Sequence, residues 1–273
     1  MSIIKSYLLP HSPLLIPEIG KANYNLLKKT ADIYQKIAAD LAENKIDTVV
    51  IFTPHEEQQI DHFLINCFPE MEISFQDFGF IPPKTTIKGD IPLADQIKNQ
   101  LKEDFPVKQV SSSSLDYGSG IPLYLLKGQN YNFKTVVIAP ADNLELDYQV
   151  SFGEKLLPIL ENSPKKIAII ASGDLSHRLM RKSPGGYSPK GPKFDNKLIE
   201  YLSYPESAVS NILKMDKRLI LDASECGLKP ILILLGVLKE KTWQPEILAY
   251  QTDFGIGYLS MEFILENKST ANL

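Results

Sequence analysis

Four short runs of β-branched residues constrain the fold of this chain more than any other feature. They carry few or no charges, and longer stretches with helical spacing of apolar residues separate them; the runs are Ile3–Leu9, Thr48–Phe52, Thr135–Ala139 and Ile167–Ala171. Strands of this composition are usually covered on both faces. Their alternation with helices is typical of an α/β fold. We therefore expect a three-layer domain with a central, mostly parallel or mixed sheet between helices.

The other elements follow from the same periodicities. Apolar residues recur at helical spacing in five further stretches, which predict helices at Lys21–Glu43, Asp90–Glu103, Phe194–Leu202, Ala208–Leu213 and Leu228–Leu238. Short strands are expected over Phe63–Phe80, and alternation of apolar and polar residues predicts a strand pair over Ile247–Ile264, turning at Gly255 or Gly257. No linker of biased composition divides the chain. We expect a single domain over residues 1–266 and a flexible tail over 267–273.

Composition excludes several classes of function. The net charge of −4 is dispersed without a basic stripe, so we expect no nucleic-acid partner. The longest apolar run, Pro230–Leu238, is too short for a bilayer, which takes about 20 residues, and predicts a buried helix. The first residues lack a signal-peptide pattern, and Cys67 and Cys226 are too few and too far apart for a disulfide framework. We therefore expect a cytoplasmic protein without a membrane segment.

Three of the four histidines lie just past the carboxyl ends of the expected buried strands. His11 follows the first of the four runs, His55 the second and His177 the last. In open α/β sheets, ligands bind outside the carboxyl ends of the strands. Pro10 and Pro54 stiffen the turns that carry the first two histidines, which suits metal ligands that need one fixed orientation. The alternative for this pair is hydrogen bonding to backbone at the core edge.

Glu225 is the candidate for a third ligand. It directly precedes the apolar helix expected at Leu228–Leu238, where its charge can point into the protein. A buried carboxylate is costly unless it is paired or bound to metal. The alternative is a helix N-terminal charge that the helix dipole favours. Two histidines and a carboxylate are the ligand set of non-haem Fe(II) oxygenases and also suit a catalytic zinc, so both metals stay open.

A polar turn separates His177 from the strand before it. Asp174 in this turn could orient His177 or a metal ligand through a hydrogen bond, or it could cap a short helix. The loop after His177 is rich in glycine and proline. Such loops often cover a neighbouring site, and the alternative is a surface excursion.

Five segments together resemble one family: PHSPLLIPEIG, FTPHEE, LDYGSGIPLYLL, ASGDLSHRL followed by GPKFD, and SECGLKPILILLG. Their order and spacing are similar, nearly end to end, to the catalytic, B-type subunits of the class III extradiol ring-cleavage dioxygenases, and most of all to stand-alone members related to the Memo proteins. The resemblance implies a single α/β domain in which His11, His55 and Glu225 bind Fe(II) and His177 is the acid/base group. It also implies a catechol-like aromatic and O₂ as substrates, and a homodimer.

One position departs from that family's pattern. Its members usually carry a histidine where this chain has Tyr117, between Asp116 and Gly118. A tyrosine can donate a hydrogen bond but is no proton acceptor near neutral pH, so Tyr117 joins His177 and Asp174 as a candidate catalytic group with a changed role. Two alternatives to the dioxygenase remain. One is a zinc-dependent hydrolase at the same ligands, and the other is a non-catalytic, Memo-like metal-binding module.

Overall fold

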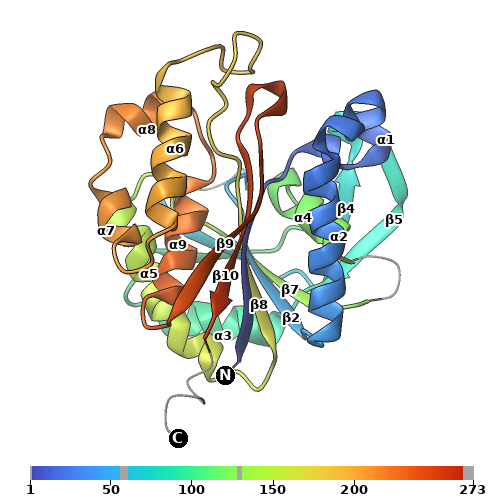
Figure 1. Ribbon diagram of the computed structural model, residues 1–273. Helices are drawn as coiled ribbons and strands as arrows, with labels where there is room; N and C mark the ends of the chain where they lie inside the picture. Colours follow the sequence, from blue (N-terminus) through green and yellow to red (C-terminus); the bar gives the residue numbers. More distant parts are fainter. Residues whose placement is uncertain (1, 56–60, 128–130, 267–273) are drawn as a thin grey trace, which may run out of the picture.

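The computed structural model describes residues 2–55, 61–127 and 131–266, so the tail expected at 267–273 lies outside the described residues. An eight-stranded sheet runs through the centre in the order β6-β3-β7-β2-β8-β1-β10-β9 (Figure 1). Its strands are β1 (Ile3–Leu9), β2 (Thr48–Phe52), β3 (Phe63–Asn66), β6 (Val107–Val110), β7 (Lys134–Ala139), β8 (Ile167–Ser172), β9 (Trp243–Gln251) and β10 (Tyr258–Leu265). A separate two-stranded sheet consists of β4 (Glu70–Phe75) and β5 (Phe80–Lys88).

The central sheet is mixed, as expected. Strand β2 pairs in parallel with β7 and β8, and β8 pairs in parallel with β1. Strand β10 is antiparallel to β1 and β9, and β3 is antiparallel to β7. Every residue of β2 and β8 is buried. The charge-free, β-branched runs therefore form the middle of the sheet, where both faces are covered.

Helices cover both faces of the sheet (Figure 1), which confirms the three-layer α/β fold. One layer contains α3 and α5 to α9, and the other contains α1, α2 and α4, each with its own hydrophobic core. The helices are α1 (Pro17–Gly20), α2 (Lys28–Glu43), α3 (Ile91–Leu101), α4 (Tyr117–Lys127), α5 (Leu146–Glu161), α6 (Lys190–Leu202), α7 (Ala208–Leu213), α8 (Lys217–Ala223) and α9 (Leu228–Leu238). Short 3-10 helices are η1 (Pro13–Leu15), η2 (Lys21–Leu27), η3 (Gln76–Phe78) and η4 (Asp253–Gly255).

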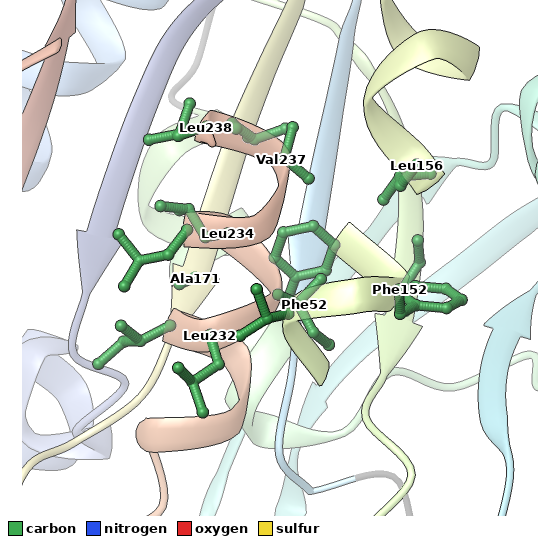
Figure 2. Close-up of a cluster of buried hydrophobic side chains, with 14 of the residues drawn as sticks. Phe52, Phe152, Leu156, Ala171, Leu232, Leu234, Val237 and Leu238 are labelled. Carbon is green, nitrogen blue, oxygen red and sulfur yellow. The ribbon is translucent and has the colours of Figure 1, made fainter. Parts of the chain in front are cut away.

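Helices α5 and α9 form the tightest helix contact of the first layer. Gly153 of α5 meets Gly236 of α9, and a Cβ on Gly153 would lie 2.9 Å from the Gly236 Cα. The two backbones therefore pack directly on one another. Phe152 of α5 and the leucines of α9 lie over Phe52 of β2 and Ala171 of β8 (Figure 2). This contact fixes α9 against the central strands.

Helices α4 and α5 are absent from the elements predicted by periodicity. Helix α4 contains Gly118, Gly120 and Pro122, and α5 contains Gly153 and Pro158. These residues lower helix propensity, so a periodicity search passes over both stretches. Both helices are nevertheless extensively buried, and tertiary packing overrides the local preference.

The structure corrects one of the expected helices and confirms the expected strand pair near the end of the chain. The stretch Lys21–Glu43 is not one helix, because residues up to Leu27 form the 3-10 helix η2 before α2 begins. The strand pair over Ile247–Ile264 is confirmed as β9 and β10, which turn through η4, where Gly255 has a φ of 72°. Within the described ranges, none of the helices has the length and apolar character needed to cross a membrane.

Candidate metal centre

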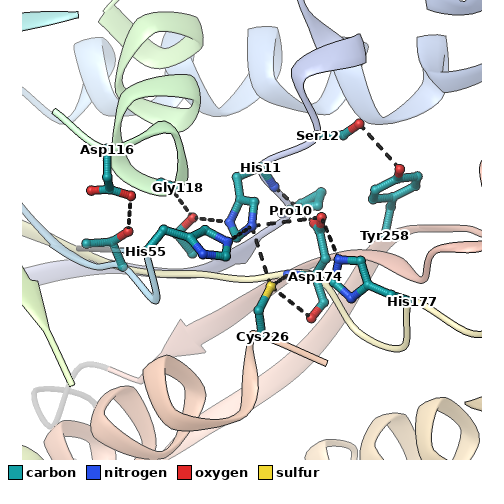
Figure 3. A network of polar contacts seen from close by, with 12 residues as sticks. Pro10, His11, Ser12, His55, Asp116, Gly118, Asp174, His177, Cys226 and Tyr258 are labelled. Atoms are coloured by element: carbon teal, nitrogen blue, oxygen red, sulfur yellow. Dashed lines mark hydrogen bonds and ion pairs between the residues drawn. The ribbon is translucent and has the colours of Figure 1, made fainter. Parts of the chain in front are cut away.

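Three histidines meet at the carboxyl edge of the sheet, as the strand ends predicted. Strands β2, β8 and β1 are parallel neighbours, so the turns that follow them open on the same edge. His55 follows β2, His177 follows β8 and His11 follows β1. Figure 3 shows their side chains in one polar network. The Tyr34 hydroxyl donates to the carbonyl of Pro10 and so fixes the turn that presents His11.

His11 and His55 direct the same ring nitrogen toward one another. Their Nε2 atoms are 3.1 Å apart, and His11 is only 1% exposed. The Sγ of Cys226 lies 3.5 Å from Nε2 of His11. The ligand atoms of these three residues all lie within 4.8 Å of one another. Two nitrogens and a sulfur thus surround one point, an arrangement suited to a single metal ion.

Ser172 sets the tautomer of His11. The Ser172 hydroxyl donates its one hydrogen to the Gly118 carbonyl, so its oxygen accepts a hydrogen bond from Nδ1 of His11 at 2.9 Å. Protonation at Nδ1 leaves Nε2 of the neutral ring with a free lone pair. Burial, reinforced by His55 and His177, lowers the pKa of His11 well below its ordinary value. Near neutral pH, His11 is therefore an uncharged ring with its lone pair aimed at the shared point.

His177 is held as a base by the backbone. Its Nδ1 lies 2.7 Å from the carbonyl oxygen of Ser224, which can only accept, so Nδ1 carries the hydrogen and Nε2 is free. Burial also lowers the pKa of His177 below its ordinary value. Its side chain keeps 23% of its surface exposed. His177 therefore combines an accessible position with an unprotonated nitrogen.

Asp174 lies between the two imidazole rings (Figure 3). One carboxylate oxygen accepts the backbone N–H of His11 at 3.1 Å, and the other lies 3.9 Å from Nε2 of both His11 and His177. Burial raises the pKa of Asp174 to about 7, and the hydrogen bond from His11 offsets only part of that rise. The sequence left two roles open for Asp174, the orientation of a histidine and the capping of a short helix. Asp174 follows β8, no helix begins directly after it among the described residues, and it lies beside both histidines, so the structure favours the first role.

Tyr117 packs against the two metal-site histidines through its ring. It stacks on His55 with a centroid distance of 4.3 Å and meets His11 edge-on at 5.5 Å. Burial raises the pKa of Tyr117, so its hydroxyl keeps its proton. Asp116 starts α4 by accepting the backbone N–H of Ser119 at 3.1 Å. The start of α4 therefore places an aromatic wall and a hydrogen-bond donor beside His55.

Cys226 reaches the site through a close backbone crossing. Gly173, after β8, packs on Gly227, before α9, and a Cβ on Gly173 would lie 2.2 Å from the Gly227 Cα. The carbonyl of Asp174 accepts hydrogen bonds from the backbone N–H groups of both Cys226 and Gly227. Burial raises the pKa of the Cys226 thiol well above its ordinary value. The two glycines thus let the turn before α9 carry a sulfur to His11.

Glu225 lies beside this group of ligand atoms and makes a different contact. Its carboxylate accepts the backbone N–H of Leu228, the first residue of α9, at 2.7 Å, so it lies at the helix N-terminus as the alternative from the sequence supposes. Burial raises the pKa of Glu225 to about 7. Within the described part of the chain, the converging ligand atoms come from His11, His55 and Cys226 and not from Glu225.

A cavity of about 400 Å³ opens beside His55 and Tyr117. The end of β4 and η3 form another wall, with Phe78 edge-on to Tyr117 at 5.5 Å. Serine, glutamine and aspartate side chains supply most of its polar lining. It is large enough for a single aromatic ring with small substituents.

The comparisons with known proteins show the family of this chain. Residues 5–261 match the family described as the catalytic LigB subunit of aromatic ring-opening dioxygenase. The chain belongs to this family. It is 31% identical over its full length to Protein CA_C1420 of Clostridium acetobutylicum and spans 60% of that relative's length. It is also 26% identical to a 3,4-dihydroxyphenylacetate 2,3-dioxygenase of Escherichia coli, over 70% of this chain and 72% of the other.

The fold has a solved counterpart. The crystal structure of uncharacterized protein JW3007 from Escherichia coli K12 superposes with a TM-score of 0.68 at 17% identity, covering 95% of this chain and 99% of that one. Family membership across residues 5–261 confirms the resemblance of the short motifs to the ring-opening dioxygenases.

Proposed function

We propose that the protein is a non-haem Fe(II)-dependent extradiol dioxygenase that opens the ring of a catechol-like aromatic. Membership of the ring-opening dioxygenase family supports the reaction class, and the Escherichia coli relative named for 3,4-dihydroxyphenylacetate supports an aromatic diol. The observation that carries the proposal is the approach of two Nε2 atoms to 3.1 Å, because His11 brings a lone pair and no proton. Neutral imidazole nitrogens that share one point fit a divalent metal ion.

His11 and His55 would hold the metal, and the third ligand would come from the turn before α9. The family resemblance assigns Glu225, which would have to give up its hydrogen bond with the Leu228 backbone. The geometry offers Cys226, whose sulfur already lies 3.5 Å from Nε2 of His11. When bound, Fe(II) would supply a redox centre and a template for the diol oxygens and O₂.

His177 would be the acid/base group of this reaction. Its free Nε2 can accept the proton of a substrate hydroxyl and later return it, which is general acid–base catalysis near neutral pH. Asp174, 3.9 Å from that nitrogen, would orient the ring and stabilise its protonated form. The protonated hydroxyl of Tyr117 would serve as a hydrogen-bond donor to the substrate.

Turnover by the iron-loaded protein tests the proposal. After anaerobic reconstitution with Fe(II), we expect O₂ uptake and a yellow ring-opened product from at least one of a set of catechols. His177→Ala should keep the metal and lose turnover by about 10²- to 10⁴-fold. His62→Ala alters the histidine outside the site and is the matched control, with both properties retained. Absence of O₂ uptake by fully iron-loaded protein with every catechol would overturn the proposal.

A second pair of variants assigns the third ligand. Glu225→Gln and Cys226→Ser each remove one candidate ligand with little change of shape. The variant that removes the true ligand should lose bound Fe(II), and its neighbour should retain it. Loss in Glu225→Gln alone would support the assignment from the resemblance, and loss in Cys226→Ser alone would support the assignment from the geometry.

The cysteine favours a second candidate function. Thiolate and imidazole are the ligands that zinc prefers in proteins, and Tyr117 stands where the family's histidine usually lies. A zinc-dependent hydrolase or a non-catalytic, Memo-like metal-binding module would use the same residues. Zinc after purification without added metal, together with no O₂ uptake after iron loading, would favour this second candidate. Hydrolytic turnover would then separate the enzyme from the module.

A further inference from the structure

A basic pocket of about 630 Å³ lies at the amino ends of the central strands, at the opposite edge of the sheet from the histidines (lower edge in Figure 1). Four lysines line it, Lys45, Lys88, Lys134 and Lys165, whereas Asp47 is the one carboxylate among its described lining residues. The chain as a whole carries a net charge of −4. A local excess of positive charge in an acidic chain therefore needs its own explanation.

The strand register builds this cluster. Lys134 starts β7 directly opposite Thr48 of β2, and an isolated bridge pairs Gly89, after β5, with Thr135. Lys88 and Lys134 therefore lie on neighbouring strands, about 5 Å apart in the backbone. Like charges at that spacing are destabilising. The closeness of Lys88 and Lys134 is therefore a cost to the fold that a bound anion would relieve.

Two nearby carboxylates make their hydrogen bonds to groups other than the ammonium groups of these lysines. The carboxylate of Asp47 accepts the backbone N–H of Lys166, and that of Glu70, opposite Lys88 in the β4–β5 sheet, accepts the Thr86 hydroxyl. Within the described residues, Lys45, Lys88 and Lys134 have no ion-pair partner. Three ammonium groups are thus available at the mouth of the pocket.

The fourth lysine is held rigidly at the pocket wall. Both carboxylate oxygens of the fully buried Asp90 lie 2.6 Å from Nζ of Lys165, and the Thr48 hydroxyl donates to the same carboxylate. The side chain of Lys165 keeps 29% of its surface exposed. Its ammonium therefore has one hydrogen left for a ligand, in a position that needs no reorganisation on binding.

Lys45 occupies a backbone position that glycine usually takes. It follows the end of α2 with a φ of 54°, and the N–H groups of Lys45 and Ile46 close the helix on the carbonyls of Ala42 and Leu41. Glycine adopts this left-handed conformation with less strain. The chain instead places a lysine there, with its side chain at the pocket. The ring of Tyr131 lines a further wall, fixed by its hydroxyl, which donates to the Ile46 carbonyl.

We propose that this pocket binds a small, multiply charged phosphate anion. Several ammonium groups around one concavity match the charge of a diphosphate, and each can form a charge-assisted hydrogen bond to a phosphate oxygen. The volume of the pocket suits a small molecule. The diphosphate could be inorganic or the phosphate chain of a nucleotide, whose ring would lie against Tyr131. The inference is independent of the chemistry proposed for the histidines.

Calorimetric titration with pyrophosphate at low salt tests the proposal. We expect saturable binding of one pyrophosphate per chain, weakened by added salt because screening reduces the attraction. Lys88→Ala/Lys134→Ala should bind at least tenfold more weakly. Lys193→Ala/Lys214→Ala removes the same charge from exposed sites elsewhere and is the matched control, with affinity retained. All four lysines are exposed, so both double variants should fold, which thermal melting checks.

Two further measurements show which site binds pyrophosphate and whether the natural ligand is the inorganic anion or a nucleotide. His11→Ala, which alters the metal centre, should bind pyrophosphate as the wild type does, because the two sites lie at opposite edges of the sheet. Titration with ADP distinguishes the ligand source: tighter binding than pyrophosphate indicates a nucleotide, and equal or weaker binding indicates the inorganic anion. No saturable binding of either ligand overturns the proposal. Equal weakening by the two double variants, or loss in His11→Ala, overturns it as well.

Discussion

Asp90 and Asp174 are both buried aspartates, yet they lie at opposite edges of the same sheet and in opposite electrostatic surroundings. Asp90, at the amino ends of the strands, has Nζ of Lys165 2.6 Å from both of its oxygens. Asp174, at the carboxyl ends, accepts the backbone N–H of His11. The titratable side chains beside it are His11 and His177, whose lowered pKa values keep their rings neutral. Burial consequently raises the pKa of Asp174 to about 7.

The difference lies in what compensates each buried carboxylate. At the amino end the chain supplies its own cation, so the buried charge is compensated. At the carboxyl end the chain instead brings together groups that can bind a cation: a carboxylate, a thiol and the lone pairs of the imidazole rings. Buried groups of this kind are costly unless they are paired or bound to a metal. The carboxyl end therefore lacks a positive charge that a divalent cation would provide.

The largest expected effect comes from Asp174→Asn in the metal-free protein. The folded pKa of about 7 lies above the ordinary value of 3.8, so the proton on Asp174 stabilises the folded state, and this stabilisation is lost as the pH rises from about 4 to 7. The variant does not titrate there. Its advantage over the wild type in free energy of unfolding should grow by roughly 4 kcal/mol across this window. Urea unfolding with EDTA measures it, and a constant difference would contradict the comparison.

The same exchange at the other aspartate should act in the opposite direction. Asp90→Asn leaves the charge of Lys165 beside a neutral amide, which should lower the free energy of unfolding by roughly 3 kcal/mol. Asp104→Asn is the control, because its pair with Lys155 is exposed and should contribute less than about 1 kcal/mol. Chemical denaturation of the three proteins checks the order. Equal losses in the two variants would show that Asp90 is not specially compensated.

A moderate effect is expected from Ser172→Ala. Without this hydroxyl, Nδ1 of His11 loses its acceptor and the ring is no longer held in the tautomer that frees Nε2. Affinity for Fe(II) should fall by about 10- to 100-fold. Ser6→Ala is the matched control, because the buried Ser6 hydroxyl has no hydrogen-bond partner among the described residues. Equal metal affinity in both variants would remove the tautomer argument.

The smallest effect is expected from Tyr117→Phe. The ring stack on His55 remains, and the lost hydroxyl was a protonated group that could not ligate a metal. Fe(II) affinity should therefore change less than about fivefold, since the loss is worth under about 1 kcal/mol. Metal titration checks this. A larger loss would show that Tyr117 belongs to the ligand set and not to the substrate wall.

The sequence predicted those parts of the site that depend on strand ends. Buried parallel strands have near-continuous β-branched runs, which mark the strand ends in the sequence. The positions of His11, His55 and His177 at those ends could therefore be predicted from the sequence alone. Cys226 could not be found in this way. Its place at the site depends on the crossing of Gly173 over Gly227, two residues 54 positions apart in the sequence.

Polar contacts between residues far apart in the sequence could not be predicted from it either. The contact of Asp90 with Lys165 spans 75 positions, and neither residue stands out within its own segment. Glu225 shows a different limit, because its position before an apolar helix fits a metal ligand and a charge at the helix N-terminus equally well. In the structure its carboxylate bonds the Leu228 N–H at that N-terminus, and its ligand role stays a prediction.

Anaerobic titration with Fe(II) tests the central claim most directly, with bound metal counted per chain. The account predicts one tightly bound Fe(II) in the wild type and in His62→Ala, and none in His11→Ala or His55→Ala. Metal-free wild type after titration, or one retained equivalent in both His11→Ala and His55→Ala, would contradict it.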